Sequence, residues 1–116
     1  MKLMLKRQAK EVKIGSTCSA IEYEIGDEDI NGAVIKLRGR SPESGSVVNT
    51  KCKEMAYVME GAGKIEIEGE KVLLNPEDMV IIEAGEKYFW DGSMTLFVSC
   101  TPAWTAEQSQ RVNTGT

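Results

Sequence analysis

The sequence predicts an all-β domain, either an antiparallel sandwich or a barrel. Short apolar runs recur from about residue 32 to residue 102, and turn-forming residues separate them. Several of these runs alternate apolar and polar residues, which is typical of half-buried strands. No convincing helical repeat lies among them, so we expect short strands joined by tight turns.

The first clear strands are separated by a loop rich in turn formers. Residues 33–37 form an apolar run that predicts a strand. Residues 39–46 contain a proline, glycines and three serines, which predicts a loop. Residues 55–59 predict a second strand, and the Glu-Gly-Ala-Gly sequence at 60–63 predicts that a turn closes it.

The central strands follow at short intervals. Residues 64–68 alternate strictly between charged residues and isoleucines, which predicts a half-buried strand. Gly69 turns the chain into a strand at 72–74, and the turn at 75–78 leads into 79–82. Because residues 79–82 are all apolar, we expect them to be buried on both faces or at a dense part of the core.

The last strands surround a hairpin signal. A turn at 84–86 precedes a short aromatic strand at 88–90. The dipeptide Asp91-Gly92 is typical of a two-residue hairpin turn, because both positions of such a turn need a positive φ. Residues 95–100 then predict the final core strand.

The two ends of the chain are less regular. Probable edge strands lie at 11–14 and 20–25. Pro102 predicts the end of the sheet, since proline donates no backbone hydrogen bond. Residues 105–108 have the spacing of a helix capping box and predict one short helical turn, and the polar residues 111–116 predict a frayed tail.

Length and composition indicate one globular domain spanning residues 1–116. The 116 residues are 28% charged and 41% hydrophobic, as in ordinary globular proteins. The net charge of −4 argues against nucleic acid and anionic membranes as partners. No apolar run approaches the ~20 residues of a membrane span, and the N-terminus lacks a secretory signal pattern, so we expect a cytoplasmic protein.

The cysteines fit the same location. Cys18, Cys52 and Cys100 are odd in number and form no CxxC pair, which favours reduced thiols over a disulfide framework. We expect each to act as a small buried hydrophobic residue.

Residues 32–101 resemble the cupin superfamily, in particular its small single-domain cupin-2 type. The first cupin motif ends in a glutamate, six residues and a glycine, which Glu54 and Gly61 match within the sequence Tyr-Val-Met-Glu-Gly. The spacing of the second motif places Gly85 at a retained glycine and Tyr88 at the histidine. This resemblance implies a double-stranded β-helix, or jelly-roll, barrel with at most a short C-terminal helical turn.

The resemblance also implies where a metal would be bound in related proteins. Metal-dependent cupins hold the ion with three histidines and a glutamate, but this sequence contains no histidine. The first two histidine positions fall on Val48 and Thr50, or on Val47 and Asn49 in a variant of the motif that is one residue longer. Because only Glu54 of the four ligands is retained, we expect no metal and no other cofactor.

Strand parity predicts a cavity site in place of the metal. If residues 48–54 stay extended, Thr50, Cys52 and Glu54 point into the barrel together, and Tyr88 and Trp90 join them from the facing strand. These five side chains are the candidate ligand-binding residues. They suit an organic molecule that stacks on an aromatic face and forms hydrogen bonds at its edge.

Each candidate also has a structural explanation. Glu54 could be a remnant of an ancestral site, and Tyr88 and Trp90 could be core packing that fills the space of a lost metal. Trp104 is expected to plug the barrel end or contact a partner. Lys36 and Arg38 share one face of a strand, which we expect to point outward; pointing inward, they would form an anion site opposite Glu54.

The favoured function is therefore a metal-free cupin that binds a small organic molecule. One alternative is a metal-independent isomerase, epimerase or lyase acting on a sugar or hydroxy acid, with Glu54 and Tyr88 as the catalytic acid and base. Another is a structural dimerisation module with a filled barrel; an open polar cavity would argue against it. We expect a homodimer in either case, with the apolar N-terminal residues at 1–5 covered by the partner.

Overall fold

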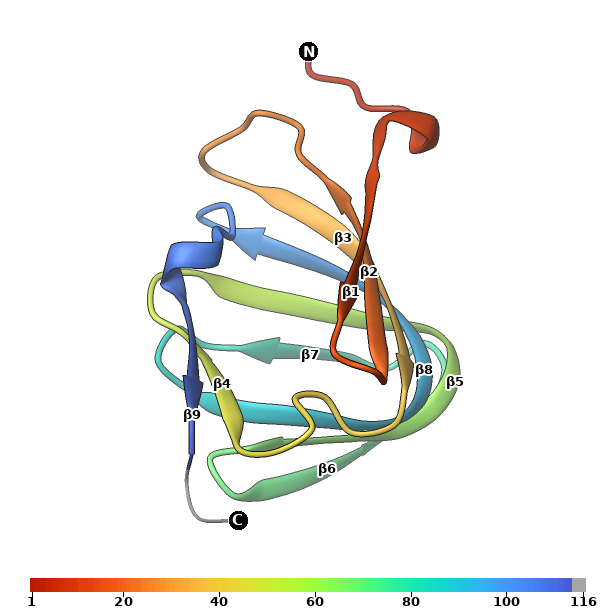
Figure 1. Cartoon of the computed structure of the whole chain (residues 1–116), viewed down its shortest axis with the longest axis vertical. Helices are drawn as coiled ribbons and strands as arrows, with labels where there is room; N and C mark the ends of the chain where they lie inside the picture. The colour runs from red at the N-terminus through yellow and green to blue at the C-terminus, as the bar shows by residue number, and fades with distance from the viewer. Residues whose placement is uncertain (114–116) are drawn as a thin grey trace.

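The computed structural model describes residues 1–113 and contains a single curled antiparallel sheet (Figure 1). Its elements in chain order are the 3-10 turn η1 (Lys6–Gln8), β1 (Lys10–Ile14), β2 (Cys18–Tyr23), β3 (Asn31–Arg38), β4 (Ser46–Asn49), β5 (Lys53–Ile67), β6 (Glu70–Leu74), β7 (Met79–Ile82), β8 (Lys87–Thr101), the 3-10 turn η2 (Ala106–Gln108) and β9 (Ser109–Val112). The predicted all-β class is confirmed. Within residues 1–113, no helix has the length and apolarity needed to cross a membrane.

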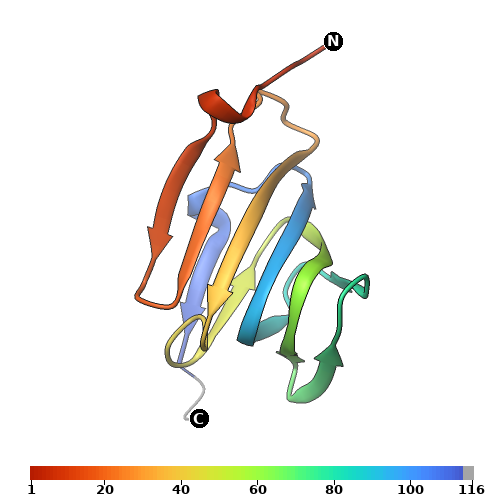
Figure 2. The same cartoon turned by 90° about the vertical axis from the view of Figure 1, so that its right-hand side faces the viewer.

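The long strands β5 and β8 form the spine of the barrel. They pair in antiparallel register from Lys53 opposite Thr101 to Ile67 opposite Tyr88. Beyond β8 the sheet continues through β3 and β2 to β1, whereas β6 and β7 pair with the two ends of β5. Figure 2 shows β1, β2, β3 and β8 side by side on one wall. The sheet curls around an apolar interior that includes the fully buried Leu37, Ile65 and Leu96.

The turns expected at 60–63 and at Asp91-Gly92 are wrong, because each lies inside one continuous strand. Gly61 and Gly92 have positive φ values of 82° and 133°, and Gly63 pairs directly with Gly92. A Cβ on Gly63 would lie 2.5 Å from the carbonyl oxygen of Asp91, and one on Gly92 would lie 2.5 Å from the Cα of Gly63. These glycines therefore allow two paired strands to bend together at close backbone approach.

The sheet also does not end at Pro102. Ser109–Val112 forms β9, which pairs with β4 from Ser46 opposite Val112 to Asn49 opposite Ser109. The frayed tail expected from residue 111 is wrong for residues 111 and 112. These belong to β9, because β4 has a free edge that β9 covers. Asn113 follows the strand without regular structure, and residues 114–116 of the expected tail lie outside the described residues. The short turn expected at 105–108 is present as η2.

The expected burial of residues 79–82 on both faces is also wrong. β7 pairs only with β5 and alternates, with Ile82 buried at 2% exposure and Met79 and Ile81 exposed at 56% and 48%. Only the inward residues of this strand face the core. Its outer apolar residues belong to an exposed face of the sheet.

Candidate functional site

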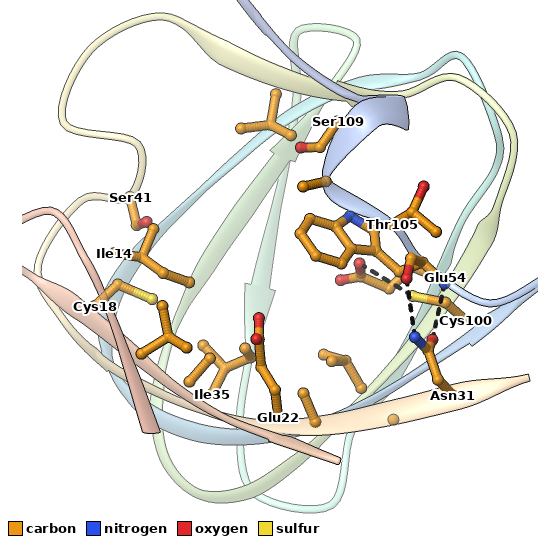
Figure 3. Close-up of a pocket in the computed structure, with 18 of the residues that line it drawn as sticks. Ile14, Cys18, Glu22, Asn31, Ile35, Ser41, Glu54, Cys100, Thr105 and Ser109 are labelled. Carbon is orange, nitrogen blue, oxygen red and sulfur yellow. Dashed lines mark hydrogen bonds between the residues drawn. The ribbon is translucent and has the colours of Figure 1, made fainter. Parts of the chain in front are cut away.

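The barrel holds a cavity of about 660 Å³, open to solvent, between the hairpin of β1 and β2 and the segment that leads into η2. Its walls are largely apolar, with Val12, Ile14 and Ile35 among the lining residues. Polar side chains enter it from several elements, and Figure 3 shows Glu22, Glu54 and Asn31 around the space. The volume lies in the range of small-molecule sites, and the barrel is not filled by its own side chains.

Glu54 is the buried carboxyl group of this cavity. It is the second residue of β5 and pairs with Cys100 of β8, and its side chain is 8% exposed. Its Oε1 accepts a hydrogen bond from Asn49 Nδ2 at 3.5 Å and one from Cys100 Sγ at 3.7 Å. Burial raises the pKa of Glu54 to about 7, although these two hydrogen bonds favour the ionised form. Near neutral pH this group can therefore take up or release a proton.

Asn49 connects the polar groups at this end of the cavity. It is the last residue of β4, is 3% exposed, and its Nδ2 lies 3.5 Å from Glu54 Oε1 and 3.4 Å from Tyr88 OH. Its Oδ1 accepts a hydrogen bond of 3.1 Å from the indole nitrogen of Trp104. Because an indole nitrogen only donates, this contact fixes the amide so that its NH₂ group faces Glu54 and Tyr88.

Tyr88 and Trp90 form the aromatic wall that strand parity predicts. Both lie on β8, are 7% exposed and line the cavity, with ring centroids 6.3 Å apart and planes at 80°. Burial, followed by the nearby Glu54 charge, raises the pKa of Tyr88 well above its usual value. Tyr88 is therefore a neutral phenol at physiological pH, suited to donate a hydrogen bond.

Trp104 lies in the cavity wall, a position that the sequence did not predict. Its backbone N–H donates to Asn31 Oδ1, and its carbonyl accepts from Asn31 Nδ2, each at 2.9 Å. This pair of hydrogen bonds holds the segment after Pro102 against β3, and the indole reaches Asn49. Both tryptophans of the chain thus line the same cavity.

Thr50 and Cys52 do not line the cavity. The chain leaves the extended conformation between β4 and β5, so the parity that relates these residues to Glu54 is broken. Thr50 is exposed and donates to the carbonyl oxygen of Gln108, and the backbone N–H of Cys52 donates to Gln108 Oε1 at 2.8 Å. Gln108 thereby fixes this loop. Of the three cysteines, Cys18 and Cys100 line the cavity.

The charged residues of the cavity are mostly acidic. Glu22 on β2 points into the space in Figure 3, and Glu24 also lines it. Lys36 and Arg38 are exposed and are not among the lining residues. Glu22 was missed from the sequence, although it shares parity with the buried Cys18 and Ala20, and a charged residue at an inward position was the available signal.

The side chains at the cupin metal positions do not fit a transition metal. Val47 lines the cavity and Asn49 faces Glu54, so the longer of the two motif variants matches the geometry. Val47 has no donor atom, and Asn49 presents its NH₂ group rather than its oxygen to Glu54 and Tyr88. Within residues 1–113, no group of three or more His, Cys, Asp or Glu residues is arranged to hold an ion. Only Glu54 provides an anionic ligand.

Comparison with known proteins supports the fold independently. No protein-family model matches the sequence, and no curated protein matches it. Among solved structures, Pac13 of Streptomyces, a nucleoside dehydratase, aligns with a TM-score of 0.86 at 15% identity, covering 94% of this chain and 88% of Pac13. Variants of Pac13 have been determined with uridine.

Two further structures share the architecture. KdgF of Halomonas sp. aligns with a TM-score of 0.65 at 16% identity over 84% of this chain and 92% of its own length. Ectoine synthase of P. lautus aligns with a TM-score of 0.66 at 18% identity over 91% of this chain and 86% of its own length. The fold is that of a cupin barrel, and these similarities establish the fold alone.

Proposed function

We propose that this barrel binds a small organic molecule in its cavity without a resident metal ion. The ligand would carry a ring that stacks against Trp90 or Trp104 and polar groups that reach Glu54. The observation that carries the proposal is the buried Glu54 carboxyl group in an open cavity, where hydrogen bonds within residues 1–113 reach only its Oε1. No buried side-chain oxygen within residues 1–113 lacks a partner, so Oε2 is accessible from the cavity, where a ligand could donate a hydrogen bond to it in place of water.

A ligand screen tests the proposal directly. Uridine is a suitable first probe because Pac13 structures contain it, and a metabolite panel extends the search. Since both tryptophans line the cavity, intrinsic fluorescence and the two indole N–H signals in NMR spectra report on occupancy. We expect at least one compound to raise the melting temperature and shift both indole signals. If no compound in the whole panel shifts either indole signal, the binding role is contradicted.

A lyase activity is the second candidate, and the proton-transfer capacity of Glu54 favours it. In an elimination of water, ionised Glu54 would take the proton from a carbon atom as the C–H bond breaks and its electron pair forms the double bond. The neighbouring C–O bond breaks, and the leaving hydroxide would take the same proton from Glu54, so that water is the product. Tyr88, held neutral, would stabilise the departing oxygen by a hydrogen bond.

Hydrogen exchange distinguishes catalysis from binding. Bound compounds are incubated with the protein in D₂O, and NMR follows the loss of each C–H signal. A lyase of this kind exchanges the abstracted hydrogen or forms an alkene, and Glu54→Gln abolishes both. A protein that binds the same compounds without exchange or product is a binding protein.

A further inference from the structure

The walls of the cavity carry an excess of acidic groups. Glu22, Glu24 and Glu54 line it, and Lys10 is the one basic residue among the described residues that do so. Lys10 and Glu22 are register partners on β1 and β2, yet no ion pair within residues 1–113 joins them. Lys10 is exposed, whereas Glu22 is half-buried. The carboxylates therefore dominate the charge that a ligand meets.

The other cationic groups near the barrel are directed elsewhere. Lys36 and Arg38 lie at the outward positions of β3, opposite Thr95 and Ser93. The guanidinium of Arg38 donates to the carbonyl oxygen of Leu37. The guanidinium of Arg40 donates to the carbonyl oxygens of Pro42 and Gly45 and stacks over the Phe89 ring at 3.7 Å. None of these three residues lines the cavity.

We propose that the cavity selects neutral or cationic ligands and rejects anions, and that Glu22 enforces this selection; the inference rests on the proposed function. Glu22 enters from the wall formed by the β1–β2 hairpin, and Glu54 belongs to β5 (Figure 3). No hydrogen bond within residues 1–113 engages the Glu22 carboxyl group, so it is free to accept one from a hydroxyl or ammonium group of the ligand. A carboxylate or phosphate there would meet like charge in a partly desolvated space.

This inference narrows the substrate class. Sugars, nucleosides and amines can donate hydrogen bonds to the carboxylates of Glu22 and Glu54. Hydroxy acids and phosphate esters would bring a negative charge close to them. Ionisation of Glu54 strengthens the effect, because burial raises its pKa to about 7 and the cavity gains negative charge above that pH. Discrimination against anions should therefore be greater at pH 8 than at pH 6.

Matched probes test the selection at pH 8. Three ring systems, phenyl, indole and uracil riboside, are each prepared with a hydroxymethyl, an aminomethyl and an anionic group at one position, the last being a carboxylate or phosphate. Dissociation constants are measured by tryptophan fluorescence. We expect the neutral and cationic members of a set that binds to do so at least tenfold more tightly than the anionic member.

Two variants assign the effect to Glu22. Glu22→Gln should reduce the preference for the cation over the anion at least threefold. Glu11→Gln is the matched control, since it removes the same charge from the same hairpin at an exposed residue that does not line the cavity, and it should leave the preference unchanged. An equal loss in both variants, or none in Glu22→Gln, overturns the role of Glu22.

The outcomes separate this inference from the proposed function. Anionic members that bind as tightly as their neutral partners overturn the selection and leave the binding role intact. Absence of binding by all nine compounds overturns the selection, and absence of binding by the metabolite panel as well overturns the binding role.

A second inference rests on the opposite surface of the sheet. Two adjacent cross-strand rows without a charged residue run over its outer face, across β2, β3, β8, β5 and β7. We call them the outer apolar rows: Ile21, Val34, Phe97, Tyr57 and Met79 in one, and Tyr23, Gly32, Ser99, Met55 and Ile81 in the other. Phe97, Met55, Met79 and Ile81 are between 38% and 56% exposed. An outer sheet face is normally polar, so these rows indicate a covered surface.

The charges that border the outer apolar rows match a second copy of the chain. One border carries Lys36 and Glu60, the latter accepting from Thr95 Oγ1 at 3.3 Å. The other carries Lys53, whose Nζ lies 3.5 Å from Glu83 Oε1 of the same chain. In such a dimer, a two-fold axis would run parallel to the rows, between the two packed faces and next to Ala56. It would place Glu60 of one copy opposite Lys53 of the other. We infer that the chain forms a homodimer by packing these faces together.

Light scattering and sedimentation velocity test this dimer at micromolar concentration, where we expect twice the chain mass of 12.8 kDa. Phe97→Glu should weaken association at least tenfold. Leu73→Glu is the control, because Leu73 is 73% exposed on β6, outside the rows, and should have no effect. Deletion of residues 1–8 should also leave the dimer intact, in contrast to the N-terminal interface expected from the sequence.

Charge reversal tests the orientation of the two copies. Lys53→Glu and Glu60→Lys should each weaken association at least tenfold, and the double variant should recover to within threefold of the wild type. A wild-type monomer overturns the dimer. Dissociation by the N-terminal deletion with no effect of Phe97→Glu moves the interface away from this face, and failure of the double variant to recover overturns the proposed orientation.

Discussion

Asn49 determines how the polar groups of the cavity are arranged. Its amide reaches Glu54, Tyr88 and Trp104, which belong to three different segments of the chain. Because both of its polar atoms are engaged and it is 3% exposed, its orientation is fixed before a ligand enters. The site is therefore preorganised around a carboxyl group of tunable charge.

Replacing Glu54 by glutamine should change the pH dependence of stability. Burial raises the pKa of Glu54 from 4.5 to about 7, so between these values the folded protein holds a proton that the unfolded chain releases. The free energy of unfolding of the wild type should fall as pH rises through this window, by about 3 kcal/mol in total. Glu54→Gln should remove this fall.

Urea unfolding at pH 5 and pH 8 measures the effect. We expect the variant to be the more stable protein at pH 8 and close to the wild type at pH 5. An identical pH dependence in the two proteins would show that Glu54 keeps an ordinary pKa.

The aromatic wall yields a contrast between two variants. Trp90→Leu should retain the fold at a cost of about 1–3 kcal/mol, because leucine still fills much of the space, yet abolish binding of any ligand that stacks on the indole. Tyr88→Phe should weaken binding by about 1–3 kcal/mol if the phenol donates to the ligand, and also loses its contact with Asn49. Calorimetric titration measures the change in binding of each variant, and urea unfolding measures the stability cost of Trp90→Leu. Unaltered binding in both would place the ligand outside this cavity.

At the level of elements, the barrel depends on two long strands that bend without a break. Gly61, Gly63 and Gly92 lie where β5 and β8 bend together, and backbone atoms occupy the space that their side chains would need. This bend carries Tyr88 and Trp90 to one end of the pair and Glu54 to the other. The curvature that brings both ends to one cavity is therefore encoded by glycine rather than by turns.

A pair of alanine substitutions separates crowding from backbone strain. Gly61 and Gly69 have nearly equal φ values of 82° and 83°, but a Cβ on Gly61 would meet the backbone of Ser93, whereas one on Gly69 would meet nothing within 4 Å. Gly69→Ala should cost about 1–2 kcal/mol, the strain of the left-handed conformation. Gly61→Ala should cost at least about 2 kcal/mol more. Equal costs by urea unfolding would show that the bend relaxes freely.

At the scale of the whole molecule, an acidic, aromatic cavity lies on the inside of one sheet and an apolar face lies on its outside. Of the outer apolar rows, Tyr23 and Gly32 at one end also line the cavity. Association through the rest of the outer face would leave the other cavity walls free, so binding and dimerisation involve largely opposite sides of the same strands. Ligand binding is then expected to be independent of protein concentration.

The protein should be purified without a stoichiometric transition metal. Glu54 is the single anionic residue at the positions that match the cupin metal ligands, and Asn49 directs a hydrogen-bond donor at it. Elemental analysis of protein prepared without chelator is the measurement. A first-row metal near one per chain, lost in Glu54→Gln, would contradict this expectation.

The sequence by itself determined the all-β class, because alternation is a local property of each strand. The barrel followed from the resemblance to cupins, and strand parity within that barrel placed Glu54, Tyr88 and Trp90 on its inner side. It also predicted strands close to β1, β2 and β3, and three buried cysteines.

Only the tertiary structure decided which residues meet. Thr50 and Cys52 leave the site because Gln108, from a distant segment, fixes their loop outside the extended conformation. Asn49, Glu22 and Trp104 enter it because β4, β2 and the segment after Pro102 close on one cavity from separate parts of the chain. Glycines expected in turns became bends because backbone approach between two long strands is a property of the pair, and neither strand encodes it alone.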